Sequence, residues 1–240
     1  MRQNSFNFNE GEVLLLNKPL TWTSFDVVNK VRNETRAKKV GHAGTLDPLA
    51  TGLLILCTGK STKKIDEYQA KEKEYTGTIT LGSTTPSYDL ETEIDTIFDI
   101  SHITPEAIKT ATVQFIGTIM QMPPQYSAKN VNGERAYNIA RRGEIATVIP
   151  RQIEISEFEI VTIDLPKVEF RVVCGKGTYI RSLAHDFGKA LNSGAHLSSL
   201  CRTRIGSFKL EDAWQMEDFI AEMKVLRSLQ NEMGISKATQ

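Results

Sequence analysis

The sequence contains few of the residues from which metal and disulfide sites are built. Only 3 cysteines and 4 histidines occur in 240 residues. The cysteines are far apart and form no CxxC pair, and the histidines form no HExxH motif. We therefore expect free thiols, buried in the interior, and no bound metal ion.

Long apolar runs and a secretion signal are missing as well. No stretch reaches the ~20 apolar residues that a membrane-spanning helix requires. The N-terminal residues, MRQNSFNFNEGE, lack the apolar segment of a signal peptide. We expect a cytoplasmic protein with no membrane partner.

The formal net charge is zero, but the charged residues are unevenly distributed along the chain. The 29 Lys and Arg residues equal the 29 Asp and Glu residues in number. Between Lys73 and Lys109 every charged residue is acidic, so the rest of the chain is basic. Such polarity lets one positive face meet an anionic partner although the total charge cancels. We expect a loop with little core over residues 84–101. A solvated acidic loop without a binding role explains the same charge pattern equally well.

Strand-like and helix-like segments alternate along the chain. The strand pattern covers residues 12–17, 53–56, 73–81, 153–163, 168–174 and 196–208. The helical pattern covers a segment capped by Thr23 or Ser24, residues 60–68 and 105–115, a segment ending near Leu191, and the C-terminal tail. This mixture predicts an α+β protein, and the length allows one large domain, or one domain with a smaller lobe.

The stretch VGHAGTLDPLATGLLI, residues 40–55, places one carboxylate in a glycine-rich loop. Pro48 restricts Asp47 to extended or turn geometry, which excludes a mid-helix position. The apolar run that follows is typical of a buried strand, so the sequence predicts an aspartate on a tight loop braced by a core strand. Most Asp-Pro aspartates only hydrogen-bond their own backbone, and this loop alone does not separate that role from a chemical one.

A basic, aromatic-containing segment occupies residues 121–151. It contains paired prolines, an NVNG turn and more basic than acidic residues, with Tyr126 and Tyr137 interleaved. Aromatic rings stack on bases and cations meet phosphates, so we interpret the segment as a mobile RNA-binding arm that includes Arg141 and Arg142. An ordinary surface helix and loop is an equal alternative.

A second glycine-flanked turn, residues 175–181, lies between a strand and a helix. It presents backbone N–H groups and a helix N-terminus, with Lys176 and Arg181 adding positive charge. It is not a P-loop, because the GxxxxGK[ST] spacing is absent. The His185-Asp186 pair that follows is similar to a motif of metal phosphohydrolases but has no partner ligands in the sequence.

Several long motifs occur in one order along the chain. They are KPLTWTSFDVV, GHAGTLDPLATGLL, KEYTGTITLG, MPPQYSAKNVNGERAYNIARRG, CGKGTYIRSLAHDFG and GAHLSSLCRTRIGSF. In this order they resemble the TruB family of tRNA pseudouridine synthases, over residues 12–210. The resemblance implies the pseudouridine synthase fold, a mixed and mainly antiparallel sheet with flanking helices and a catalytic cleft.

The resemblance also implies an activity and a set of site residues. The expected enzyme is an isomerase that converts uridine 55 in the T-loop of tRNA to pseudouridine, without a cofactor and as a monomer. The family's nucleophilic aspartate corresponds to Asp47, its base-stacking tyrosine to Tyr75, and the arginine paired with the aspartate to Arg181. Further positions match residues that bind the substrate or line its pocket: Lys18, His42, Asp89, Tyr179 and Leu200.

Two features depart from the family pattern. Many bacterial members end in a small RNA-binding PUA domain, for which we expect no room here. We expect a single catalytic domain, residues 1–240, with the arm at 121–151 and a helical tail at 212–240. The segment LGSTTPSYDLETEID also departs, with Pro86 and Tyr88 beside Asp89, which weakens the assignment of Asp89.

Two other functions agree less well with the sequence. A non-catalytic tRNA-binding or tRNA-folding protein on the same scaffold would lack Asp47, Tyr75 or Arg181, and all three are present. An aspartate-based hydrolase such as a glycosidase needs a second carboxylate at a defined distance, and no motif supplies one.

Overall fold

The computed structural model of the protein describes residues 6–127, 130–131, 133–135, 137, 139, 142–144 and 147–237. The chain forms two compact units. The first unit combines the segments before and after the second, namely residues up to Lys71 and from Arg202 onwards, and the second unit runs from Glu72 to Cys201. Strand β12 (Ala195–Ile205) therefore begins in the second unit and ends in the first.

Three strands of an antiparallel sheet form the centre of the first unit. Their central strand is β3 (Ala50–Thr58), with which β1 (Val13–Lys18) and β2 (Val40–His42) both pair antiparallel. The short β13 (Phe208–Lys209) pairs with the end of β12. Nearly all of β3 is buried, as its apolar sequence predicts. The remaining short elements are η1 (Gly59–Lys64), α2 (Ile65–Ala70) and η3 (Leu210–Asp212).

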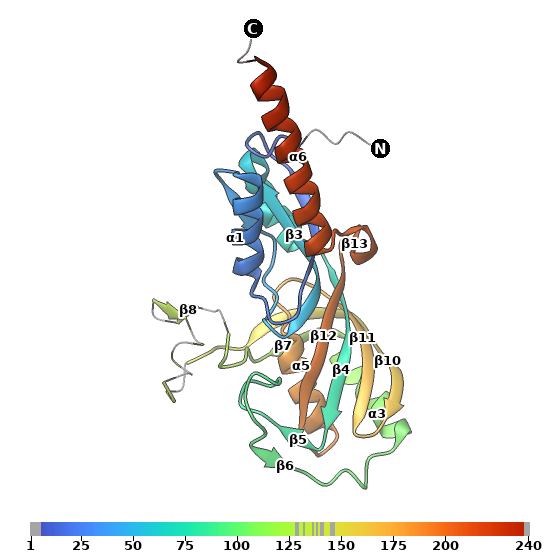
Figure 1. Ribbon diagram of the computed structural model, residues 1–240. Coiled ribbons are helices and arrows are strands. Elements are labelled where there is room, and N and C mark those ends of the chain that lie inside the picture. The colour runs from blue at the N-terminus through green and yellow to red at the C-terminus, as the bar shows by residue number, and fades with distance from the viewer. Residues whose placement is uncertain are drawn as a thin grey trace. The chain divides into compact units, whose positions relative to one another are not determined.

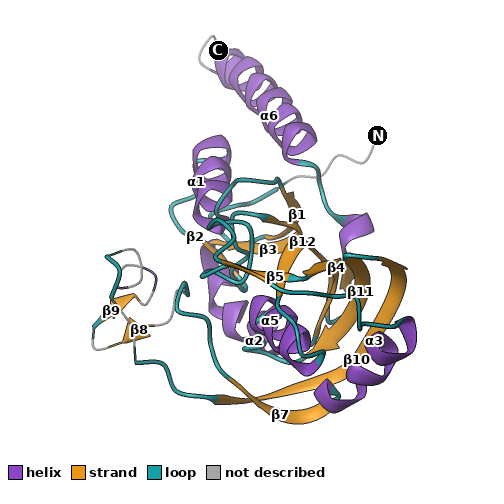
Figure 2. Ribbon diagram, turned by 90° about the horizontal axis from the view of Figure 1, so that it is seen from below, coloured by secondary structure: helices purple, strands orange, loops and turns teal. Residues whose placement is uncertain are grey.

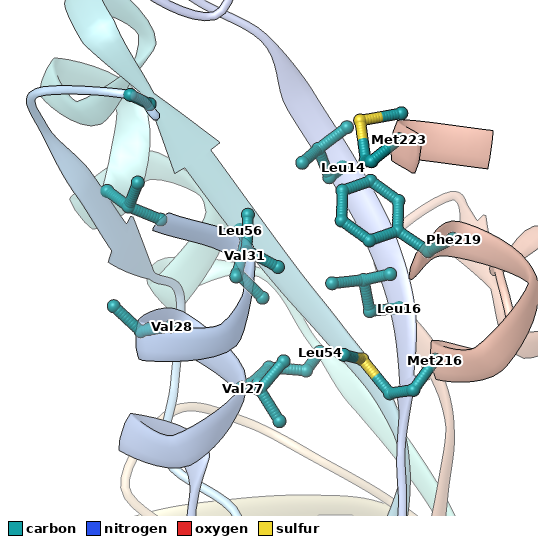
Figure 3. Close-up of a cluster of buried hydrophobic side chains, with 12 residues drawn as sticks. Leu14, Leu16, Val27, Val28, Val31, Leu54, Leu56, Met216, Phe219 and Met223 are labelled. Carbon is teal, nitrogen blue, oxygen red and sulfur yellow. The ribbon is translucent and has the colours of Figure 1, made fainter. Parts of the chain in front are cut away.

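Two helices pack on this sheet, α1 (Ser24–Thr35) and α6 (Met216–Lys237) (Figure 1). Thr23 caps α1, because its hydroxyl accepts a hydrogen bond from the Asp26 N–H while the Asp26 carboxylate accepts one from the Thr23 N–H. Figure 3 shows apolar side chains of α1, α6 and β1 meeting in one buried cluster. Phe219 lies within this cluster, which confirms the predicted helical tail and its packing on the core.

The second unit contains a longer run of paired strands. Its strands lie in the order β12, β4, β11, β10 and β7, where the new strands are β4 (Lys73–Leu81), β11 (Lys167–Cys174), β10 (Arg151–Asp164) and β7 (Gly117–Gln121). Figure 2 shows helices α3 (Pro105–Ala111) and α5 (Ile180–Ala190) beside these strands. Aromatic contacts join the layers, with Phe187 of α5 packing against Phe115 and Phe158.

The acidic segment is more ordered than the sequence predicted. We expected loop over residues 84–101, but β5 (Ser83–Thr84) and β6 (Thr96–Ile97) pair as a short antiparallel ribbon. The Thr84 hydroxyl donates a hydrogen bond to the Asp95 carboxylate, and the Asp95 N–H donates one to the Thr84 carbonyl. The loop prediction is therefore wrong at these strands, because polar pairing closes the segment without an apolar core.

Three further short elements complete the described chain. They are η2 (Val113–Phe115), β8 (Asn130–Val131) and β9 (Glu134–Arg135). The α+β class and the mainly antiparallel sheet with flanking helices are confirmed. The prediction of a single domain stays a prediction beside the two compact units. No helix among the described residues is long and apolar enough to cross a membrane.

Candidate active site

Asp47 lies in the loop that joins β2 to β3 in the first unit. The two strands pair as a hairpin. The Ala43 N–H donates a hydrogen bond to the Ile55 carbonyl at 2.8 Å, which extends the pairing by one residue beyond β2. The Ala50 N–H donates to the Asp47 carbonyl at 3.1 Å, so Asp-Pro begins a tight turn at the tip. The predicted loop position is confirmed, and the Asp47 side chain is half-buried.

Arg202 supports the first half of this loop from within the protein. Its side chain is fully buried, at 1% exposure, and donates hydrogen bonds to the Leu53 carbonyl at 2.8 Å and the Gly44 carbonyl at 3.1 Å. Gly52 lies against its backbone, because a Cβ there would come 2.4 Å from the Arg202 carbonyl oxygen. Gly52 is thus required by close packing within the unit.

Ser24 and Lys18 support the second half of the loop. The Ser24 hydroxyl accepts a hydrogen bond from the Leu46 N–H at 2.9 Å and contacts the Leu46 carbonyl at 3.2 Å. The Lys18 ammonium reaches the Pro48 carbonyl at 3.2 Å, and it also donates to the carbonyls of two residues near its own position in the chain. The main chain on both sides of Asp47 is therefore fixed by buried side chains.

The buried ammonium of Lys18 has an unusual pKa. Burial lowers the pKa of Lys18 from 10.5 to about 8, although Asp47 and then Asp26 oppose this shift, while Arg202 adds to it. The same ammonium contacts the carbonyl of Pro48, the residue that follows Asp47. The structure thus brings together Lys18 and Asp47, two of the predicted site residues.

His42, at the end of β2, belongs to the same unit. Burial lowers the pKa of His42, a hydrogen bond with the Gly44 backbone opposes this, and Arg202 adds to the lowering. The imidazole is therefore neutral at pH 7. A neutral ring suits contact with a base better than contact with a phosphate.

Arg181 and Asp89 form the charged centre of the second unit. Arg181 lies in the first turn of α5, and its Nε is 3.6 Å from the Asp89 carboxylate, with both side chains almost fully buried. The same guanidinium donates to the Ser87 carbonyl at 3.0 Å and to the Tyr126 carbonyl at 2.8 Å. Arg181 therefore joins the turn that carries Asp89 to the start of the segment predicted as an arm.

The other predicted residues of this unit lie on its strands and at the start of α5. Tyr75 is buried on β4, where it pairs with Val172 of β11, and Leu200 is half-buried on β12. Tyr179 is half-buried, and its backbone exchanges two hydrogen bonds with the Gln121 side chain, at 2.8 and 3.0 Å. The start of α5 is thus fastened to the start of the predicted arm.

The two arginines of the arm differ in what the structure describes. Arg141 lies outside the described residues. Arg142 is exposed and forms ion pairs with Glu134 at 2.5 Å and Glu144 at 2.9 Å, which raise the pKa of its guanidinium further. The predicted mobility of residues 121–151 stays a prediction, because several of them lie outside the described residues.

Sequence reasoning missed Ser24 and Arg202 as supports of the Asp47 loop. Ser24 is a candidate helix cap in the sequence, and Arg202 lies within the strand predicted at residues 196–208. An arginine within a buried strand indicates a cation that needs acceptors, and this is the signal that could have identified Arg202. Within the described part of the chain, no cluster of three or more His, Cys, Asp or Glu side chains is arranged to hold a metal ion. Of the three free cysteines, two are buried and Cys201 is only half-buried.

Comparison with known proteins places this geometry in a family. Residues 32–180 match the family described as TruB family pseudouridylate synthase (N terminal domain). The chain belongs to this family. Residues 181–234 match a second description, tRNA pseudouridylate synthase B C-terminal domain.

Curated relatives of similar length support the assignment. A protein of Phocaeicola vulgatus named tRNA pseudouridine synthase B is 55% identical over 219 residues, covering 89% of this chain and 93% of its own. A protein of the same name from Flavobacterium johnsoniae is 56% identical over 211 residues, covering 85% and 92%. Similarity at this level covers both compact units.

Chains in two solved complexes share the fold. A chain in a Cbf5-Nop10-Gar1 complex is 31% identical with a TM-score of 0.69, covering 89% of this chain and 54% of its own. A chain in an H/ACA RNP bound to a substrate RNA containing 2'-deoxyuridine is 28% identical with a TM-score of 0.67, covering 89% and 53%. The protein spans about half the length of each of these chains, and the likeness supports the predicted pseudouridine synthase fold.

Proposed function

We propose that the protein converts uridine to pseudouridine at position 55 in the T-loop of tRNA. The observation that carries the proposal is the Asp47 loop, in which buried Arg202, Ser24 and Lys18 side chains hold the main chain on both sides of one carboxylate. A carboxylate aimed in this way suits a reaction that requires one well-placed nucleophile or base. The names of the curated relatives support the same activity.

The reaction itself needs little else. The N1–C1′ glycosidic bond breaks, the uracil turns, a C5–C1′ bond forms, and the proton at C5 is lost while N1 gains one. No net oxidation occurs, so no cofactor is required. Asp47 attacks C1′ or C6, or removes the C2′ proton, and all three routes use the same carboxylate position.

The other site residues act on the flipped base and on the charge of Asp47. As the family resemblance implies, the Arg181 guanidinium keeps the Asp47 carboxylate ionised where water is excluded. Tyr75 stacks on the uracil, because an aromatic face binds a base that has left its own stack. Asp89 faces the uracil from the turn at residues 87–89.

The remaining residues position the RNA. His42 contacts the opened T-loop, Leu200 forms an apolar wall of the pocket, and Tyr179 contacts the substrate beside Arg181. Arg141 and Arg142 bind phosphates once RNA replaces the acidic partners of Arg142. We further propose that the protein works as a monomer in the cytoplasm.

The test is pseudouridine formation in a T-arm RNA incubated with the purified protein. Asp47→Asn lowers the rate by more than about 100-fold, because the amide is neither a nucleophile nor a base. Binding of the RNA stays within about tenfold, because the substitution is nearly isosteric. Asp66→Asn, at an exposed aspartate of α2, is the matched control and keeps full activity.

Two outcomes would overturn the proposal. Turnover by Asp47→Asn at a hundredth of the wild-type rate would exclude Asp47 as the nucleophile. Tight binding of T-arm RNA by the wild-type protein without any pseudouridine would instead identify a non-catalytic tRNA-binding protein. Mass spectrometry of the RNA after cyanoethylation reports the product directly.

A further inference from the structure

Tyr88, which lies in the segment that departs from the family pattern, packs against the side chain of His185. Its ring stacks on the His185 ring, with 3.8 Å between the ring centroids and 11° between the planes. The His185 Nδ1 is buried and has no hydrogen-bond partner among the residues that the structure describes. The contact therefore uses the flat face of the imidazole and not that nitrogen.

One face of α5 holds three consecutive residues of the neighbouring turn. Arg181 and His185 are four residues apart in the helix, so their side chains lie on the same face. Arg181 binds the Ser87 carbonyl and pairs with the Asp89 carboxylate, while His185 stacks on the residue between them. The turn at residues 87–89 is thus attached to α5 at every position.

The stack opposes a backbone strain in this turn. Tyr88 has a φ of 64°, in the left-handed region that costs a non-glycine residue about 1 kcal/mol or more. The Leu197 N–H donates to the Tyr88 carbonyl at 2.9 Å and the Tyr88 N–H donates to the Thr85 carbonyl at 3.1 Å, but both bonds hold only the main chain. The stack on His185 holds the Tyr88 side chain, so its loss lets the strained turn relax and move Asp89 relative to Arg181.

We propose that His185 is a positioning residue, which fixes the turn at residues 87–89 through Tyr88 and so sets the Asp89–Arg181 pair. This inference rests on the proposed function, since the pair serves the reaction on uridine. Burial is the main reason why the pKa of His185 falls to about 4; Lys189 adds to the shift and Asp95 opposes it. The ring is therefore uncharged under physiological conditions and stacks as a neutral aromatic surface.

The experiment compares His185→Ala with His185→Phe in single-turnover and steady-state assays on T-arm RNA. His185→Ala lowers kcat by about tenfold or more, because small displacements of site residues have large rate effects, and changes KM by less than about threefold. His185→Phe keeps a flat ring and recovers kcat to within about threefold of wild type. The control is His102→Ala, a histidine in the same unit that contacts the Leu191 carbonyl at 3.0 Å, which leaves kcat within about twofold.

A second pair of variants tests the same contact from the other side. Tyr88→Leu reproduces the loss of kcat, Tyr88→Phe does not, and Tyr88→Leu combined with His185→Ala is no slower than either alone. Additive losses, or equal losses in His185→Ala and His185→Phe, would overturn the proposal. Wild-type kcat in His185→Ala would do so as well.

A crystal structure of His185→Ala separates this inference from the proposed function. The inference predicts a displaced turn, with the Asp89 carboxylate further from Arg181 than 3.6 Å. If the wild-type protein forms no pseudouridine, the proposed function fails while this displacement still tests the positioning role. An unchanged turn in that crystal would refute the positioning role whatever the activity.

Discussion

Two carboxylates on turned loops are supported in different ways. In the first unit, buried side chains bind the main-chain groups of Gly44, Leu46 and Pro48, which flank Asp47. In the second unit, Arg181 pairs with the Asp89 carboxylate itself. Asp47 is half-buried, whereas Asp89 is 4% exposed.

The difference separates two uses of a carboxylate. Support through the main chain fixes the point from which the Asp47 side chain extends, which suits a group that must react. Direct pairing with a buried guanidinium instead makes the carboxylate part of the structure, because removal of one charge leaves the other buried without compensation. We therefore expect substitution of Asp47 to affect mainly activity, and substitution of Asp89 to affect mainly the free energy of unfolding.

The sharpest test exchanges each carboxylate for an amide. Asp89→Asn lowers the free energy of unfolding by about 3 kcal/mol, since Arg181 then stays buried without its partner. Asp47→Asn changes that free energy by less than about 1 kcal/mol but abolishes pseudouridine formation. Urea denaturation of both variants, beside the activity assay, measures the two effects. A stable Asp89→Asn protein, or an Asp47→Asn protein as destabilised as Asp89→Asn, would remove the distinction between the loops.

The main-chain support of the Asp47 loop is tested by removing its buried cation. Arg202→Met leaves the Gly44 and Leu53 carbonyls without their donor and lowers the free energy of unfolding by about 3 kcal/mol. Arg204→Met, two residues along the same strand at a half-buried position, is the matched control and costs less. Equal losses in the two variants would show that the loop does not depend on Arg202.

Some features of the Asp47 loop and of the strands can be predicted from local sequence signals. The Asp47 loop was predictable because its signals are local, namely an Asp-Pro pair, spaced glycines and an apolar run within residues 40–55. The strand at residues 73–81 was predicted with its observed bounds, since strict alternation fixes a half-buried strand. Local chemistry and periodicity therefore established most of the elements.

The supports of the loops were not predictable in the same way. Arg202 lies about 150 positions from Leu53 in the chain, and no sequence pattern in either segment predicts that the two residues are in contact. The stack between Tyr88 and His185 likewise joins the acidic segment to a helix far along the chain. Such contacts depend on how the strands are ordered in the sheet, which periodicity does not determine.

A smaller effect is expected from the hydroxyl that binds Leu46. Ser24→Ala removes the acceptor of the Leu46 N–H and lowers the free energy of unfolding by about 1 to 2 kcal/mol, because both groups are buried. The rate of pseudouridine formation falls as the loop loosens. Ser207→Ala, at an exposed turn before β13, is the control and changes neither quantity. A full rate in Ser24→Ala would indicate that the two cations are sufficient to hold the loop.

The smallest effect is a change of rate with pH that originates at Lys18. Its pKa of about 8 means that the folded protein loses this proton as the pH rises through 8, whereas the unfolded chain keeps it to about 10.5. Between these values the unfolded state binds more protons, so this group makes the fold more stable as the pH rises. The rate falls over the same interval, because the positive charge beside Asp47 is lost.

Activity and stability thus respond to pH with opposite signs if Lys18 is the group responsible. The rate of the wild-type protein halves near pH 8, where half of the molecules carry a neutral amine. In Lys18→Met the decline of the rate between pH 7 and 9 disappears, while the contribution of any other titrating group remains. Rate profiles and thermal unfolding of both proteins across this interval measure the two responses. A decline that persists unchanged in Lys18→Met would assign the titration to the RNA or to another side chain, and would leave Lys18 as a support of the main chain alone.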